Sequence, residues 1–377
     1  MGKGVSGLHI AQLGYGTVGS AFYAMAQGRA DTRVDRLLVL SPIPGVACPQ
    51  TANYEDILRD SAIDTVVELI GGLHPAYEYV AAALRHGKHV VTANKLLVCA
   101  CYDELIALAE ENGVSLRCTA AAGGGIPWLH CLARLGEADR VTAVSGIMNG
   151  TTNYILSAMT ESSTNYIENL KKAQALGYAE ADPTADVAGY DARRKLVLSA
   201  NIAFGVSIKE DEVPCFGIEG VEARDIAAFR EKGLVCKLIA HARSEQDVVS
   251  ACVEPMLFPE NSAMAHVSGP NNMICLRAER VGVQRFAGAG AGGFATASNV
   301  LADCLEISRG CSAFYTAQRT PMRVNNGKLI QPYYVRVLDS VRFTEPLSAD
   351  AAHRLAAEYK QEQLPFFMAA LSEDAEC

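Results

Sequence analysis

The sequence predicts an α/β protein with a doubly wound parallel sheet, followed by an α+β domain. Three observations support this prediction. Short apolar strands alternate with helical segments between residues 8 and 119, and a glycine-rich turn joins the first strand to the first helix. An acid-rich segment at residues 177–195 leads directly into a long apolar helix. Regular alternation of strand and helix is typical of a parallel sheet with helices on both faces.

Composition limits the classes of partner. The chain has 377 residues, half of them apolar, which is enough for two domains. Its net charge of −9 argues against nucleic acid or an anionic membrane as partner. The twelve cysteines lack metal-type spacing and no secretory signal is visible, so reduced thiols in the cytoplasm are expected. No apolar run approaches the roughly 18 residues that span a bilayer. A small-molecule partner fits best.

The first element is a strand over Leu8–Leu13, and a helix is expected over Thr17–Ala26. Between them, Gly14-x-Gly16-x-x-Gly19 matches the Rossmann dinucleotide fingerprint. Gly14 permits the tight turn, Gly16 lets the backbone approach a pyrophosphate, and Gly19 lets the helix pack on the strand. The helix N-terminus offers unpaired N–H groups to the phosphates. The expected cofactor contacts here are Gly14, Gly16, Thr17, Val18 and Gly19.

The second strand, expected over Arg36–Leu40, should end near the adenosine ribose. An acid at its end is the usual signal for NAD. Ser41 and Pro42 follow instead, which removes the repulsion against a 2′-phosphate. Arg36 lies at the wrong end of the strand to bind that phosphate. NADP is favoured and NAD stays open.

The strand-and-helix pattern then continues, and ligands of such sheets bind beyond the carboxyl ends of the strands. This places Gly71, Gly72 and Lys95 at the ligand edge, and Ala93 is also expected to contact the cofactor. For Lys95 the alternative is a solvated surface lysine. The expected elements are Thr65–Ile70, Pro75–Arg85, His89–Thr92, Tyr102–Asn112 and Val114–Thr119.

The acid-rich segment is the strongest candidate for a substrate site. A helix is expected to begin near residues 186–190 and to be buried on nearly all sides. Asp191 and Lys195 are four residues apart, so they share a face. The alternative is a structural ion pair, common on exposed helices. Because the helix is buried and Glu180 and Asp186 crowd its entry, we favour a site for a substrate amine, with Lys195 placed for proton transfer.

Three further segments complete the pattern. Ser145–Leu156 looks like a strand running into a helix whose start is capped by Asn149. Val248–Met256 and Met273–Val283 look like strands of an antiparallel sheet. Gly288–Ile307 combines a glycine-rich turn with a helix from about Ala297. The alternative for the glycine-rich part is a flexible linker.

Several motifs together resemble the homoserine dehydrogenase family: GYGTVG, VVELIGG with TANK, AGGGIPW, GIMNGTTNYIL and GYAEADPTADVAGYDARRK. The resemblance runs from about residue 8 to about residue 310. It implies NAD(P)-dependent interconversion of L-aspartate 4-semialdehyde and L-homoserine, on the route to threonine, methionine and isoleucine. It also implies a homodimer.

The same resemblance assigns roles to individual residues. Lys195 would exchange a proton with the substrate oxygen, and Lys95 would lie between nicotinamide and substrate. Glu180 and Asp191 would hold the substrate, including its ammonium group. The remaining assignments are Asp186 and Tyr178 in the substrate pocket, Gly150 and Thr151 as substrate contacts, and Gly290 where the chain returns to the cofactor.

The sequence departs from the family pattern at two places. Thr119 stands where the family often has a cation-binding glutamate, so a Na⁺ site would depend on the carbonyls of Ala122, Gly124 and Ile126. The tail is too short for a complete regulatory ACT domain, and no aspartokinase portion is visible, so threonine feedback through an ACT domain is not expected. The expected domains are 1–128 for the dinucleotide, with a return at about 290–310, 129–289 for substrate and dimerisation, and 311–377 as an extension.

Two rival functions stay open from the sequence alone. An aldehyde-oxidising semialdehyde dehydrogenase would need an activated cysteine, for which Cys118 and Cys131 are candidates by position. A dinucleotide-binding regulator without chemistry would not need both Lys95 and Lys195.

Overall fold

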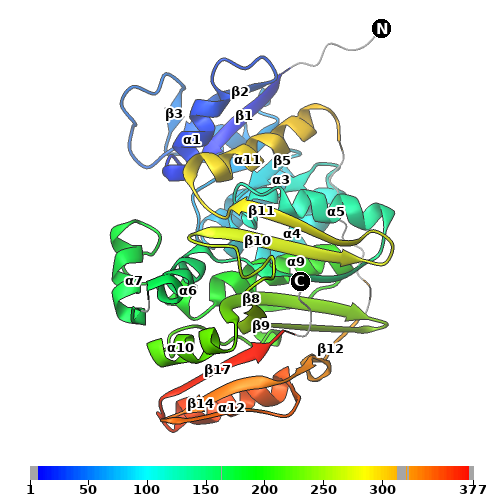
Figure 1. The fold of residues 1–377 in the computed structure, drawn as a ribbon. Coiled ribbons are helices and arrows are strands. Elements are labelled where there is room, and N and C mark those ends of the chain that lie inside the picture. The colour runs from blue at the N-terminus through cyan, green and yellow to red at the C-terminus, as the bar shows by residue number, and fades with distance from the viewer. Residues whose placement is uncertain (1–6, 163, 312–319, 321, 373–377) are drawn as a thin grey trace. The chain divides into compact units, whose positions relative to one another are not determined.

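The computed structural model describes residues 7–162, 164–311, 320 and 322–372. The chain divides into two compact units. The first contains residues 1–134 and 291–319, and the second contains residues 135–290 and 320–377. Both are drawn in Figure 1. The domain boundaries expected from the sequence stay predictions.

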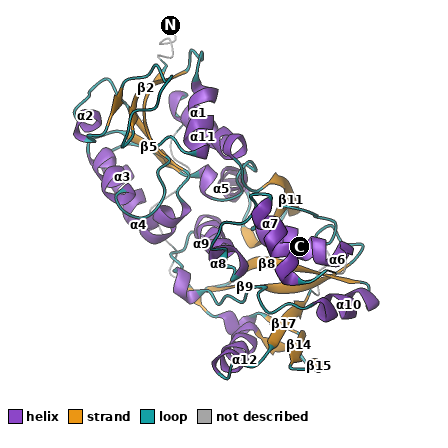
Figure 2. Cartoon of the chain, turned by 90° about the vertical axis from the view of Figure 1, so that its left-hand side faces the viewer, coloured by secondary structure: helices purple, strands orange, loops and turns teal. Residues whose placement is uncertain are grey.

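The first unit is a six-stranded parallel sheet in the order β3-β2-β1-β4-β5-β6. Helices α1 and α11 lie on one face, and α2, α3 and α4 lie on the other (Figure 2). The predicted doubly wound sheet is therefore confirmed. Its strands are β1 Leu8–Leu13, β2 Thr32–Leu38, β3 Gln50–Thr51, β4 Thr65–Glu68, β5 His89–Thr92 and β6 Leu116–Arg117. Its helices are α1 Thr17–Ala26, α2 Glu55–Leu58, α3 Ala76–Arg85, α4 Lys95–Glu111, η1 Thr119–Ala121 and α11 Gly293–Ser308.

Several expected boundaries in this unit are wrong. Strand β2 ends at Leu38, which pairs with Leu13 at the end of β1, and Leu40 is 98% exposed beyond the sheet. Helix α4 begins seven residues earlier than expected because Asn94 caps it at Lys95. Helix α11 begins at Gly293 rather than near Ala297.

The second unit is built on a nine-stranded sheet. Eight strands follow the order β11-β10-β7-β8-β9-β17-β14-β15, and β12 pairs with β9. The long β8–β9 hairpin is prominent in Figure 1. The strands are β7 Val141–Ile147, β8 Leu234–Glu245, β9 Val248–Pro259, β10 Asn271–Ala278, β11 Gly282–Ala289, β12 Arg323–Val324, β14 Tyr333–Val337, β15 Ser340–Phe343 and β17 Phe366–Leu371. A separate pair contains β13 Ile330–Gln331 and β16 Leu347–Ser348.

Helices pack on this sheet. Helix α9 lies along β7 and β8, α10 lies on β8, and α12 contacts β17. The helices assigned to this region are α5 Trp128–Ala138, α6 Gly150–Ser162, α7 Tyr166–Ala175, α8 Thr184–Val187, α9 Tyr190–Phe204, η2 Glu210–Glu212, α10 Ala223–Glu231, η3 Asn326–Lys328 and α12 Ala349–Gln361. Helix α5 begins in the first unit and ends in the second. No helix among the described residues is long and apolar enough to cross a membrane.

Only part of this sheet was predicted from the sequence. The strand expected over Met273–Val283 is a hairpin, because β10 ends at Ala278 and β11 begins at Gly282. The C-terminal segment contributes strands to this sheet: β17 pairs with β9 in parallel, and β14 pairs with β17. The tail therefore completes the sheet that carries α9.

Candidate active site

The glycine turn of the first unit is tightly packed. Gly14 has φ +91°, and a side chain there would approach the Leu69 carbonyl oxygen at 2.9 Å. A side chain at Gly19 would meet the Gly14 carbonyl oxygen at 2.5 Å. The Gln12 amide nitrogen donates to the carbonyls of Gly14 (2.8 Å) and Gly19 (2.9 Å). Both glycines are therefore required by close approach of helix and strand.

Gly16 has a different environment. It is the exposed N-cap of α1, and a side chain there would meet no atom within 4 Å. Thr17 and Val18 open the helix behind it. The open space lies where the unpaired N–H groups of a helix N-terminus favour a pyrophosphate. These residues fit a bound dinucleotide.

Glu68, the last residue of β4, is a buried carboxylate at the edge of the sheet. Its role was not predicted from the sequence. Glu68 accepts hydrogen bonds from the backbone N–H groups of Ile70 (2.9 Å) and Gly71 (3.1 Å). It also accepts one from the Thr92 hydroxyl at 2.5 Å, at the end of β5. The signal in the sequence was an acid within the otherwise apolar strand TVVELI.

Lys95 is the first residue of α4 and is half-buried. The Asn94 side chain caps the helix by accepting from the Leu97 N–H at 3.2 Å. Its amide nitrogen donates to the Gly72 carbonyl at 2.6 Å. Ala93 directly precedes this cap. Gly71 follows β4, and Ala93 and Lys95 follow β5, so all three come after the carboxyl ends of two paired parallel strands.

Lys195 lies in the second unit, in the first half of α9. Its ammonium nitrogen is 2.7 Å from the Asp191 carboxylate and donates to the Met148 carbonyl at 2.7 Å. Both charged side chains are buried. The predicted shared face of Asp191 and Lys195 is confirmed, and Met148 at the end of β7 supplies a contact that no sequence pattern indicated.

Asn149 joins the carboxylates of this site. Its amide nitrogen donates to Asp186 at 2.7 Å and to Asp191 at 3.0 Å. Its side-chain oxygen accepts from the Thr152 N–H at 2.9 Å, as expected of a helix cap. The sequence predicts the cap but does not indicate the two carboxylate contacts.

Asp186 and Thr151 form the next part of the cluster. The Thr151 hydroxyl contacts the Asp186 carboxylate at 3.2 Å and the Tyr178 carbonyl at 2.5 Å. Burial raises the pKa of Asp186, and the hydrogen bonds from Asn149 and Thr151 oppose part of that rise. A ligand ammonium group beside this carboxylate would favour its ionised form.

Three further residues are predicted to contact the substrate, and each has its own environment. Glu180 is exposed, and its backbone carbonyl accepts from Gln174. Tyr178 is 41% exposed, and its ring lies 5.1 Å from that of Tyr154. Gly150 leaves no room for a side chain, which would come within 2.6 Å of the Pro270 carbonyl oxygen.

Gly290 ends the second unit just after β11. A side chain at this position would collide with Asn272, with its nearest atom at 2.1 Å. This packing by itself explains why a glycine is present. A contact of Gly290 with the cofactor stays a prediction.

The candidate Na⁺ site fits its expected ion poorly. The Asn299 amide nitrogen donates to the carbonyls of Gly124 (2.6 Å) and Ile126 (3.1 Å). The Thr119 hydroxyl and N–H donate to the buried carboxylate of Asp303 at 2.8 and 2.9 Å. Two of the three proposed carbonyl ligands, Ala122 being the third, thus already bind a hydrogen-bond donor.

The two candidate nucleophilic cysteines lack the features of a reactive thiolate. Cys118 is fully buried. Burial raises the pKa of the Cys131 thiol, which opposes formation of the nucleophile.

The fold and these groups define a class: an NAD(P)-dependent oxidoreductase whose second unit contains a buried lysine–aspartate pair. A family model described as homoserine dehydrogenase matches residues 127–305, and one described as homoserine dehydrogenase, NAD binding domain, matches residues 14–119. The chain belongs to the homoserine dehydrogenase family. The predicted interconversion of L-aspartate 4-semialdehyde and L-homoserine, in amino-acid biosynthesis, is confirmed at the level of the family.

Individual relatives support the same family assignment. The chain is 36% identical to a homoserine dehydrogenase of Neisseria gonorrhoeae over 347 residues, covering 89% of this chain and 80% of the relative. It is 40% identical to a homoserine dehydrogenase of Corynebacterium glutamicum over 327 residues, covering 82% of this chain and 74% of that relative. The crystal structure of a homoserine dehydrogenase from Thiobacillus denitrificans superposes with a TM-score of 0.89 at 31% identity, covering 97% of this chain and 98% of that one.

Proposed function

We propose that Lys195 transfers the proton to and from the substrate oxygen. The observation that supports this most directly is the 2.7 Å contact of its ammonium group with Asp191, within a buried cluster. A buried charge is costly unless it is paired or used, and this one is paired on the same helix face.

The bound nicotinamide supplies or accepts the hydride. Lys195 then has to hold one proton at the substrate oxygen. The Asp191 carboxylate stabilises the ammonium form, which is the form that donates during aldehyde reduction. The Met148 carbonyl fixes the position of the nitrogen. During alcohol oxidation the neutral amine would accept the proton.

The carboxylate side of the cluster would bind the substrate ammonium group. Asp186 is half-buried and oriented by Asn149 and Thr151. Charge-assisted hydrogen bonds of this type are stronger than neutral ones. Glu180 and Tyr178 are assigned to substrate binding on the family resemblance, and Gly150 and Thr151 to the turn beside it.

The cofactor site is proposed at the glycine turn and the adjacent sheet edge. It consists of Gly14, Gly16, Thr17, Val18, Gly19, Gly71, Ala93 and Lys95, with Gly290 added from the resemblance. We propose NADP as the favoured cofactor, since no acid follows β2. Arg36 is paired with Asp60 at 3.3 Å, so it does not strengthen this preference.

Further properties of the enzyme are carried over as proposals. We infer a homodimer and a cytoplasmic location. A monovalent cation at Gly124 and Ile126 would have to displace the Asn299 amide. Sedimentation analysis tests the homodimer, and the dependence of activity on Na⁺ concentration tests the cation site.

The proposed role of Lys195 is tested by Lys195→Gln. Rates of L-homoserine oxidation are measured with NADP and NAD side by side. We expect kcat to fall by about 10²- to 10⁴-fold, the usual contribution of general acid–base catalysis. Lys172→Gln, on the exposed face of α7, is the matched control and should retain activity. Undiminished turnover of a folded Lys195→Gln variant would exclude the proposed role.

A further inference from the structure

A second cluster of reactive side chains lies on the sheet of the second unit and takes no part in the proposed reaction. Within the part of the chain that the structure describes, His241, Cys252 and Glu254 are the one group able to hold a metal ion. His241 on β8 pairs directly with Cys252 on β9, and Glu254 is two residues further along β9. Strand alternation therefore places all three side chains on one face.

We propose that these three residues bind a divalent transition metal of the zinc class. The ligand types agree with this choice, because Zn²⁺ accepts thiolate, imidazole and carboxylate together. A thiolate and a carboxylate would neutralise the charge of the ion, with histidine as a neutral ligand. An oxygen-preferring ion such as Mg²⁺ or Ca²⁺ would not select the cysteine.

The distances suit a tetrahedral site. Its ligand atoms lie about 3.3–3.6 Å apart when Zn–N and Zn–O bonds are about 2.0–2.2 Å and the Zn–S bond is about 2.3 Å. The Glu254 oxygen is 3.4 Å from the His241 Nε2 atom and 3.4 Å from the Cys252 Sγ atom. The remaining pair, His241 Nε2 and Cys252 Sγ, is 2.8 Å apart and would have to open. Rotation about the side-chain bonds of His241 would lengthen this distance.

The outer groups come from the C-terminal segment and orient Glu254. His353 on α12 contacts the second carboxylate oxygen at 3.0 Å, and the Tyr333 hydroxyl lies 3.2 Å from both oxygens. The Gln331 amide donates to the first oxygen at 2.7 Å. Hydrogen bonds of this kind commonly fix metal-binding carboxylates. The proposed metal would thus reinforce the attachment of residues 331–353 to the β8–β9 hairpin.

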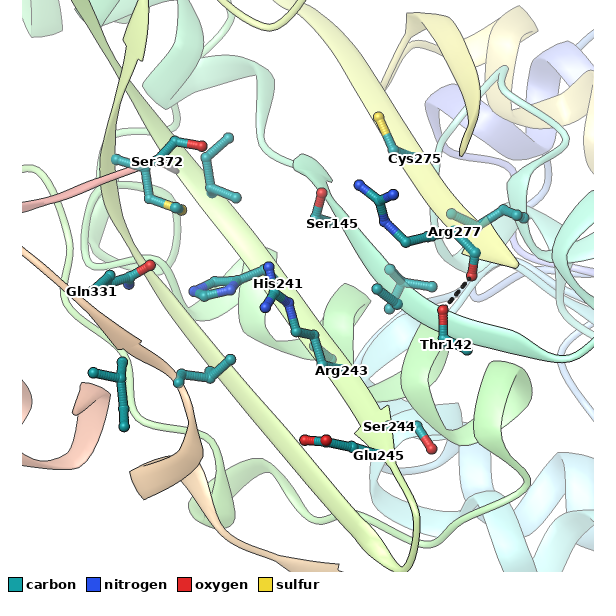
Figure 3. A pocket seen from close by; sticks show the side chains of 18 of the residues that line it. Thr142, Ser145, His241, Arg243, Ser244, Glu245, Cys275, Arg277, Gln331 and Ser372 are labelled. Carbon is teal, nitrogen blue, oxygen red and sulfur yellow. Dashed lines mark hydrogen bonds between the residues drawn. The ribbon is translucent and has the colours of Figure 1, made fainter. Parts of the chain in front are cut away.

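The site also has a route for entry. His241 and Gln331 line a cavity of about 440 Å³ over the same face of the sheet. Figure 3 shows the His241 ring pointing toward Gln331 at the wall of this cavity. Cys252 and Glu254 are fully buried behind it. A water molecule from the cavity would complete the tetrahedron.

The proposal is tested with the full-length enzyme, purified without a metal-affinity step. We expect about one zinc ion per chain by elemental analysis. After removal by a chelator, added Co²⁺ should give the visible bands of tetrahedral cobalt and a sulfur-to-cobalt charge-transfer band. Removal of the metal should also lower the thermal midpoint of unfolding, because the ion binds the folded state.

Cys252→Ser should lose the charge-transfer band. Cys275→Ser is the matched control, because Cys275 is equally buried and lines the same cavity from β10. The control should keep the band. Wild-type protein that binds neither zinc nor cobalt stoichiometrically would overturn the proposal, even if the Cys252 variant fails to fold. A cobalt band that persists in Cys252→Ser would overturn it as well.

Discussion

Asn149 shows how much of the site depends on a single polar side chain. Its amide group donates to both Asp186 and Asp191, while its oxygen caps α6. Replacing it would remove one donor from each of two buried or half-buried carboxylates and leave them with Thr151 and Lys195, which is costlier than losing one hydrogen bond between exposed groups. The residue thus connects the start of one helix to the charges of another.

Spacing along the sequence predicts contacts within one helix but not contacts between distant segments. Helical spacing alone places Lys195 over Asp191, because residues four apart share a face. No local pattern places Asn149 beside Asp186, since 37 residues separate them. The same limit explains why Glu68 was missed: its role depends on Thr92 in a neighbouring strand.

Asp186 should control the acid side of the pH profile. In its proposed role, the carboxylate would bind the substrate ammonium only when ionised, and burial raises its pKa. Protonation therefore begins at a higher pH than for an ordinary aspartate, and kcat/KM for L-homoserine should fall as the pH drops through that range. In Asp186→Asn, this acid limb should disappear and KM should rise about tenfold or more, as expected for a lost charged hydrogen bond.

The measurement is kcat/KM against pH for both proteins. Asp182→Asn is the control, because Asp182 is exposed just before α8, the helix that contains Asp186, and contacts Thr184. It should leave the profile unchanged. An identical acid limb in wild type and Asp186→Asn would remove Asp186 from substrate binding.

At the scale of elements, caps and glycines were the reliable signals. Helix α1 and strand β1 have the predicted bounds because a fingerprint turn separates them. Strand β8 was not predicted, since Lys237 and His241 interrupt its apolar pattern. Both side chains are buried and have polar partners from other elements, which a single-strand pattern does not reveal.

Lys237 connects β8 to α6 and should make stability depend on pH. Burial lowers its pKa from 10.5 to about 8, and its ammonium group donates to Asn153, Ser157 and the Val267 carbonyl. Between pH 8 and 10.5 the unfolded chain binds more protons than the folded one, so this residue's contribution to stability increases as the pH rises. Below pH 8 both states are protonated and the contribution is constant.

Urea unfolding of wild type and Lys237→Met, each at pH 7 and pH 9.5, isolates this contribution. Other titrating groups are common to both proteins and cancel. Wild type should gain about 2 kcal/mol relative to the variant between the two pH values. A difference that is independent of pH would show that Lys237 titrates normally.

At the scale of the whole molecule, the C-terminal segment is part of the second unit's framework. Strand β17 lies between β9 and β14 in the sheet, and Met368 and Ala370 belong to its apolar core. The buried Arg336 of β14 donates to Asp225 of α10 at 2.7 and 3.0 Å. The sequence could not predict this arrangement, because the parallel pairing of β17 with β9 joins segments more than a hundred residues apart.

This position of β17 predicts a large effect of Ala370→Pro. Ala370 is fully buried and pairs with Met256 on β9 and Tyr333 on β14, so a proline removes a donor from an internal strand. We expect the free energy of unfolding to fall by about 3 kcal/mol or more. Homoserine turnover at elevated temperature should be lost as well. Val341→Pro is the comparison, because Val341 is 47% exposed on the edge strand β15, where proline is better tolerated. A much lower urea midpoint for Ala370→Pro than for Val341→Pro would support a single cooperative sheet from β11 to β15. Equal midpoints for the two variants would mean that the C-terminal segment contributes little to the stability of the second unit.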